Sequence, residues 1–157
     1  MSQRHPITNE EIMLVTTNCK NRRSIFDHPP YAHEAIDVLY RVQSLHPFFL
    51  YGFVFMPDHC HLLMRVPEPQ SVSKIMDRFK MGISHSIGIG PIWQPRFHMR
   101  IAENPGEALR YIHLNPVRAN LTDAAEKFRW SSASGKWDVT ELPMNFDHHH
   151  RGQVWPL

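Results

Sequence analysis

The chain has 157 residues, of which 42% are hydrophobic and 20% are charged, and its formal net charge is +2. This length and composition predict one globular domain with its own core and exclude a disordered or fibrous chain. No apolar run approaches the roughly 20 residues of a membrane-spanning helix, and the polar first residues do not resemble a signal peptide, so we expect a cytoplasmic protein with no membrane partner.

The first half of the chain predicts a strand, a helix and a β-hairpin. Residues 12–17 are β-prone and predict the first strand. Apolar residues at three- and four-residue steps predict a helix over 31–46. An almost continuous apolar run over 48–56, a short turn and a second apolar run over 60–66 predict the two arms of a hairpin.

The second half predicts another helix and a broken strand. Ser71 or Ser73 is placed to cap a helix whose apolar residues recur at helical spacing up to Ile83. Residues 92–94 and 97–102 predict a last strand that is broken or bulged at Pro95. The order strand, helix, strand, strand, helix, strand is that of a ferredoxin-like split βαβ sandwich, an α+β fold in which two helices cover one face of a four-stranded antiparallel sheet. The other face stays free for a ligand or a further element.

A third helix and a tail follow the expected sheet. Asn104 and Pro105 are a typical cap and first turn, and we expect this helix to end at Pro116. After Ser132 the periodicity is lost. We therefore expect one domain over residues 1–132 and an irregular tail over residues 133–157.

Two histidines stand at the start of the hairpin's second arm. His59 and His61 are two residues apart, so in a strand their side chains point to the same face, about 6 to 7 Å apart along the chain. Two such imidazoles could bind one metal ion and leave room for a third ligand and a substrate oxygen. The alternative is a structural or surface pair, which the spacing alone favours.

The third helix carries residues that could complete a metal site. Glu107, Tyr111 and Asn115 are four residues apart and share one face. An asparagine oxygen is a suitable third ligand, and a tyrosine one turn away would then lie over the ion. If a divalent ion polarises a phosphodiester, the Tyr111 oxygen can attack phosphorus and form a phosphotyrosine ester that keeps the bond energy for rejoining strands. Ring packing for Tyr111 and a helix-ending role for Asn115 are the alternatives.

Four separated blocks together resemble one family. The blocks are Met56–Leu63, Ile92–His98, Tyr111–Leu121 and Arg129–Ser132. In order and spacing, over about residues 12–132, they look like the REP-associated tyrosine transposases, which belong to the single-tyrosine HUH (His-hydrophobe-His) transposases. Four blocks in order are far more specific than the histidine pair alone.

The resemblance implies a domain that recognises single-stranded DNA with an imperfect hairpin and cleaves it with Mg²⁺ or Mn²⁺. Carried over by position, His59 and His61 bind the metal, Asn115 is the third ligand, and Tyr111 is the nucleophile that forms a 5′-phosphotyrosine intermediate. The partners would be single-stranded or hairpin DNA, and the oligomeric state is open between a monomer and a homodimer. Imidazole ligands favour Zn²⁺ or Mn²⁺ over Mg²⁺, so the metal's identity is less well defined than the site.

Basic and aromatic side chains near these blocks are candidates for DNA contacts. The two rings could stack on unpaired bases while the arginines hold phosphates. Core packing is the alternative for the rings, and solvated helix charges are the alternative for the last two arginines. The predicted nucleic-acid-binding residues are Trp93, Arg96, Phe97, Arg100, Arg110 and Arg118.

Two other functions stay open beside the metal-dependent, single-stranded DNA endonuclease and transesterase. An inactive relative of a transposase would hold hairpin DNA or RNA without cutting it. A zinc-dependent hydrolase would use His59, His61 and a distant ligand, and would have no need of Tyr111. The joint presence of the histidine pair, Tyr111 and Asn115 favours the strand transferase.

Overall fold

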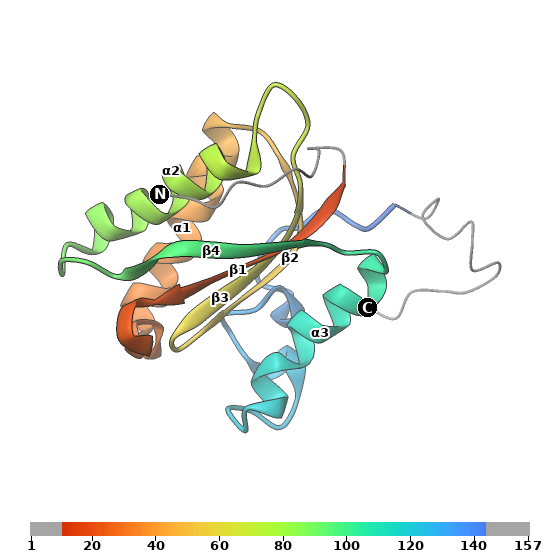
Figure 1. The fold of residues 1–157 in the computed structure, drawn as a ribbon. Coiled ribbons are helices and arrows are strands. Elements are labelled where there is room, and N and C mark those ends of the chain that lie inside the picture. The colour runs from red at the N-terminus through yellow and green to blue at the C-terminus, as the bar shows by residue number, and fades with distance from the viewer. Residues whose placement is uncertain (1–10, 144–157) are drawn as a thin grey trace.

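The computed structural model describes residues 11–143 and shows a sheet with helices on both faces (Figure 1). The strands form one antiparallel sheet in the order β2-β3-β1-β4. This is the predicted α+β ferredoxin-like sandwich with one helix added. None of the helices in the described residues is long and apolar enough to cross a membrane. The main elements are β1 (Ile12–Cys19), α1 (Pro29–Leu45), β2 (Phe49–Met56), β3 (His59–Arg65), α2 (Val72–Ile87), β4 (Trp93–Ile101) and α3 (Pro105–Arg118).

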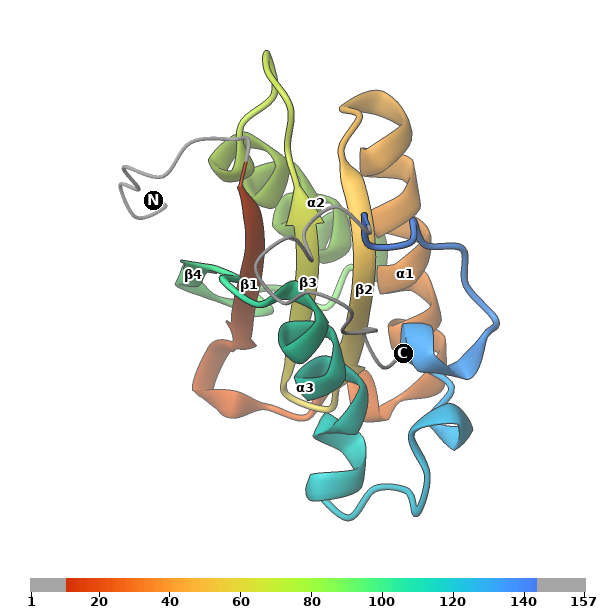
Figure 2. The same cartoon turned by 90° about the vertical axis from the view of Figure 1, so that its right-hand side faces the viewer.

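Helices α1 and α2 cover one face of the sheet, and α3 lies on the other (Figure 2). Side chains alternate between the faces of a strand, so Cys60, Leu62 and Met64 of β3 point into the main core with α1 and α2. Leu63 points the opposite way, into a smaller apolar cluster that includes Leu109 of α3. The face that the sequence left free is therefore partly covered by α3, which packs on β2 and β3.

Of the two predicted alternatives for the last strand, a break is wrong and an irregularity in pairing is confirmed. β4 runs on through Pro95, because β4 is an edge strand, where a missing N–H is tolerated, and its register against β1 shifts between Thr17 and Cys19. The predicted end of the third helix is wrong. α3 does not end at Pro116 but runs on to Arg118. A proline in the last turn removes only one helical hydrogen bond, and the turn is closed by Ala119 N donating to Asn115 O at 3.0 Å.

The segment after α3 returns across the molecule and covers the outer edge of β2. Backbone hydrogen bonds of 2.8 Å run from Phe55 N to Trp130 O and from Thr140 N to Leu50 O. Leu142 is buried in the smaller apolar cluster. The predicted tail therefore packs on the domain as far as it is described, in an irregular conformation, and its remainder, residues 144–157, lies outside the described residues.

Candidate active site

The two histidines lie on the α3 side of the sheet, at the start of β3. His61 is paired with Thr16 of β1, and His59 is paired with Asn18. The centroids of the two imidazole rings are 4.9 Å apart, and the rings stand at 79° to each other. The structure thus brings two imidazoles together on one face, as the two-residue spacing predicts.

Each imidazole is oriented by a partner at its Nδ1 atom. His59 Nδ1 is 2.7 Å from Asp58 Oδ1, and His61 Nδ1 is 2.7 Å from Thr16 Oγ1. Since a carboxylate only accepts hydrogen bonds, neutral His59 carries its proton on Nδ1 and presents the lone pair of Nε2. Such outer contacts orient metal-binding histidines. Asp58 and Thr16 were not among the predicted site residues, although the position of Asp58 directly before the histidine pair is a signal for it.

Burial and neighbouring charges set the protonation of this cluster. Burial, together with the charges of His59 and Arg100, lowers the pKa of His61 to about 3, so this imidazole is neutral at physiological pH. Burial alone would raise the pKa of Asp58, but hydrogen bonds from His59 and Arg22 outweigh it, and the pKa is lowered. A neutral imidazole and an ionised carboxylate are the states in which these groups assist metal binding.

Tyr111 projects from α3 to the histidine pair. Its ring centroid is 5.5 Å from that of His61, and the residue is 43% exposed, so its hydroxyl can be reached by a substrate. The guanidinium carbon of Arg118 lies 4.8 Å from the centre of the Tyr111 ring, and its Nη2 donates to the Tyr111 carbonyl oxygen at 2.8 Å. The exposed Arg118 therefore packs on the Tyr111 ring and restrains it.

A glycine and a hydrogen-bond chain fix the position of α3. A Cβ atom at Gly52 of β2 would lie 2.3 Å from Leu109 Cδ1 and 3.3 Å from Ser132 Oγ, so a side chain here would push α3 outward. Ser132 Oγ accepts from Phe53 N at 3.0 Å and lies 2.8 Å from His113 Nε2. Through Ser132, His113 thus ties α3 to β2, two residues from Tyr111.

The donor set fits a divalent metal ion. Within residues 11–143, no third His, Cys, Asp or Glu joins His59 and His61 in a metal-binding cluster. The further ligands would be an amide, water or substrate oxygen. Asn115 lies one turn after Tyr111 on the same side of α3, where the sequence predicts an amide ligand. Its role as third ligand stays a prediction.

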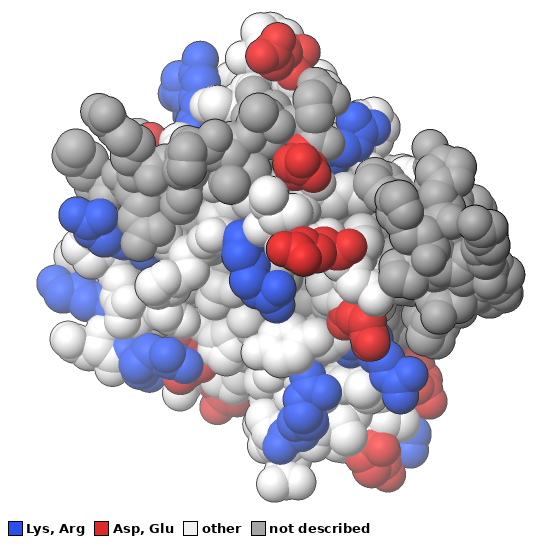
Figure 3. Space-filling view, turned by 45° about the vertical axis from the view of Figure 1, so that its right-hand side comes forward, with Lys and Arg blue, Asp and Glu red and all other residues white. Residues whose placement is uncertain are grey.

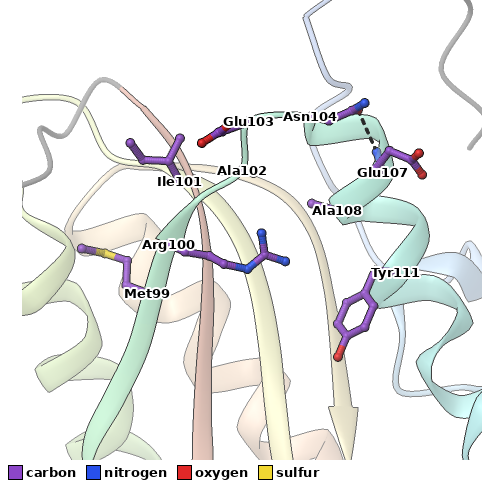
Figure 4. A pocket seen from close by; sticks show the side chains of 9 residues that line it. All are labelled: Met99, Arg100, Ile101, Ala102, Glu103, Asn104, Glu107, Ala108 and Tyr111. Atoms are coloured by element: carbon purple, nitrogen blue, oxygen red, sulfur yellow. Dashed lines mark hydrogen bonds between the residues drawn. The ribbon is translucent and has the colours of Figure 1, made fainter.

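A cavity of about 670 Å³ opens between β4 and α3 beside Tyr111 (Figure 4). The guanidinium of Arg100 extends from β4 toward α3, and the Tyr111 ring lies at the opposite wall. Glu103 and Glu107 also line the cavity, with their side chains directed away from Arg100 and Tyr111. This volume is typical of cavities that bind small molecules or parts of larger ligands.

The two aromatic residues predicted to stack on bases are in the core. Trp93 is 9% exposed and Phe97 is 1% exposed. The Trp93 ring packs against Phe26 and Phe79, with centroid distances of 5.5 and 6.1 Å. Base stacking by Trp93 and Phe97 is therefore wrong, and the packing alternative holds, because both residues lie on the side of β4 that α2 covers.

The predicted DNA-binding arginines occupy different places. Arg96 and Arg100 are exposed on β4, and Arg118 is exposed at the end of α3, against the tyrosine ring. Arg110 and His113 line a separate cavity of about 450 Å³ on the other side of α3. On the face that carries β4 and α3, the described basic and acidic side chains are interspersed and form no continuous basic area (Figure 3). Any DNA contact on this face would therefore use single arginines.

Comparison with known proteins agrees with this arrangement. A family model described as IS200-like transposase matches residues 9–113. The REP-associated tyrosine transposase of Escherichia coli (strain K12) is 30% identical over 107 residues, covering 66% of this chain and 64% of that protein. The chain thus aligns with somewhat less than two thirds of the length of this curated relative.

Solved structures share the fold. A REP-associated tyrosine transposase bound to a REP hairpin superposes with a TM-score of 0.73 at 25% identity, over 89% of this chain and 93% of that one. A candidate transposase from Deinococcus radiodurans gives a TM-score of 0.55 at 14% identity, over 77% of this chain and 92% of that one, which bears on the fold alone.

Proposed function

Because this chain belongs to the IS200-like transposase family, we propose that it is a metal-dependent strand transferase that cleaves single-stranded DNA beside a hairpin. The observation that carries the proposal is the contact of the Tyr111 ring with the histidine pair, at 5.5 Å between the centroids of Tyr111 and His61. A hairpin ligand is supported by the REP hairpin bound in the similar structure. One chain supplies both the histidine pair and Tyr111.

The proposed reaction exchanges one phosphodiester for another. The Tyr111 oxygen forms a bond to phosphorus, the bond from phosphorus to the 3′ oxygen breaks, and a 5′-phosphotyrosine and a free 3′-hydroxyl result. The phenol loses one proton and the departing oxygen gains one, so the exchange needs no further reactant. A 3′-hydroxyl can reverse the step, which is how strands would be rejoined.

The side chains around Tyr111 have separate tasks in this scheme. His59, His61 and the predicted ligand Asn115 would hold Mg²⁺ or Mn²⁺, which when bound polarises a non-bridging oxygen of the phosphate. Asp58 and Thr16 orient the imidazoles. Arg118 keeps the tyrosine ring in position.

A covalent adduct assay tests the proposal. A labelled hairpin oligonucleotide with single-stranded flanks is incubated with the protein and Mg²⁺ or Mn²⁺, and an adduct that resists SDS is expected. Tyr111→Phe should abolish the adduct while it leaves hairpin binding nearly unchanged. Tyr31→Phe, on α1 at the opposite face of the sheet, is the matched control and should retain the adduct.

Other outcomes of this assay would contradict the proposal. Cleavage that persists in Tyr111→Phe would indicate a hydrolase that uses water at the metal. Hairpin binding by the wild-type protein without cleavage in either metal would indicate a binding module without catalytic activity.

A further inference from the structure

Arg100 lies on the same face of the sheet as the histidine pair. In the register of β1 and β4, Arg100 is opposite Leu14, and His98 is opposite Thr16. Thr16 is also the partner of His61, so the row across the sheet runs from His61 through Thr16 to His98. Helix α3 packs over β2 and β3, and this leaves the β4 end of the row exposed.

Two cavities meet at Arg100. The larger one, of about 670 Å³, extends from Arg100 to Tyr111 and α3. A smaller one, of about 160 Å³, is lined by Leu14, Thr16 and His98 and shares Met99 and Arg100 with the first. Arg100 thus lies between a space beside His98 and a space beside Tyr111.

The guanidinium of Arg100 is available to a ligand. Within residues 11–143, no carboxylate lies at ion-pair distance from it, and Glu103 and Glu107 point away (Figure 4). Two other exposed arginines, Arg22 and Arg41, by contrast have acidic partners. A planar guanidinium with several free donors matches the paired oxygens of a phosphate better than any other side chain does.

We propose that Arg100 binds the backbone phosphate next to the scissile one, and that the nucleotide between these two phosphates occupies the cavity between β4 and α3. This inference rests on the proposed function, because it takes Tyr111 and the histidine pair as the place where the scissile phosphate binds. The two walls of the cavity then contact successive phosphates of one strand. The strand continues along β4 past His98.

The inference is tested by neutralising phosphates one at a time. A hairpin oligonucleotide, taken from the adduct assay or selected for affinity from a random pool, is made with a single methylphosphonate at each backbone position in turn. Binding is measured by fluorescence anisotropy with Tyr111→Phe, which cannot cleave. One methylphosphonate should weaken binding by on the order of 10-fold. In the Tyr111→Phe, Arg100→Ala double variant, that same position should have no further effect.

Two further variants show whether the effect belongs to Arg100. Arg100→Ala should lower the slope of log affinity against log salt by about 0.7, the value for one phosphate contact on a single strand. Arg100→Lys keeps the charge and should restore that slope but only part of the affinity. Arg78→Ala removes the same charge from an exposed position on α2, across the sheet, and should change neither the slope nor the phosphate profile.

The result that overturns the inference is a methylphosphonate profile that is the same with and without Arg100. This failure is distinct from failure of the proposed function. If DNA is bound but no adduct forms, Tyr111 does not act as proposed. In that case, a methylphosphonate position that weakens binding only when Arg100 is present still supports the contact. If the adduct forms normally and the two profiles coincide, the strand takes another path.

Discussion

The close approach of α3 to β2 depends on Gly52, and its replacement by alanine should displace the helix that carries Tyr111. The new Cβ atom would lie 2.3 Å from Leu109 Cδ1, well inside van der Waals contact, and 3.3 Å from Ser132 Oγ. Leu109 is 4% exposed and has little room to move. Overpacking of this kind costs about 1–3 kcal/mol, and we expect Gly52→Ala to lower the free energy of unfolding by that amount.

A double-mutant cycle identifies the clash as the cause. Leu109→Ala alone should cost about 2–5 kcal/mol through the cavity that it leaves. In the double variant Gly52→Ala, Leu109→Ala, the added methyl group enters that cavity, so the loss should be smaller than the sum of the two single losses by about 1–3 kcal/mol. Urea unfolding gives the free energies, and the rate of adduct formation reports the position of Tyr111.

Gly82→Ala is the matched control for general overpacking. Its Cβ atom would lie 2.9 Å from Val38 Cγ1, between α2 and α1, on the opposite face of the sheet from Tyr111. It should leave the rate of adduct formation unchanged, whereas Gly52→Ala should slow it. Additive losses in the cycle, or equal adduct rates in the two glycine variants, would refute the reasoning that this glycine sets the position of α3.

Three further predictions concern the histidines and the core. Burial lowers the pKa of His113 from 6.5 to about 4, so the folded state binds its proton more weakly than the unfolded state does. The contribution of the neutral His113 ring to the free energy of unfolding is therefore fully present above pH 6.5. As the pH falls from 6.5 toward 4, the free energy of unfolding decreases by up to about 1.4 kcal/mol per pH unit. His113→Gln, which can still reach Ser132, should reduce this slope in urea unfolding, and an equal slope would contradict the assignment. Asp58→Ala should weaken Mn²⁺ binding by about 10- to 100-fold in calorimetry, because His59 loses its orienting partner; the exposed Asp77→Ala is the control, and unchanged affinity would show that the partner is dispensable. Phe97→Ala should cost about 3–5 kcal/mol of stability and leave the DNA affinity of the folded protein intact, whereas lost affinity at unchanged stability would restore a stacking role.

The order of the elements was predictable because local patterns determine it. The apolar periodicity of α1 and α2 and the two apolar arms of the hairpin are visible in the sequence, and βαββαβ order then leaves few topologies. The pairing of His59 with His61 follows from alternation along one strand. These features need no knowledge of contacts between distant segments.

The support of the site could not be predicted in the same way. The contact of His113 with Ser132 joins residues from two different segments, and no spacing rule relates them. Trp93 and Phe97 lie near Arg96 and Arg100 in the sequence, which suggested a DNA-binding strand, but only the position of α2 shows which side of β4 is buried. Local pattern defines which residues share a face, while packing between elements decides whether that face meets solvent.

Both edges of the sheet are protected against pairing with strands of other molecules. An open sheet has two outer strands whose unpaired backbone groups can recruit strands from other molecules. Here the backbone of Trp130 and Thr140 occupies positions along β2, and β4 carries Pro95 with charged neighbours, which disfavour addition of another strand. The protein can therefore keep part of one sheet face open to a ligand without offering copies of itself a template for aggregation.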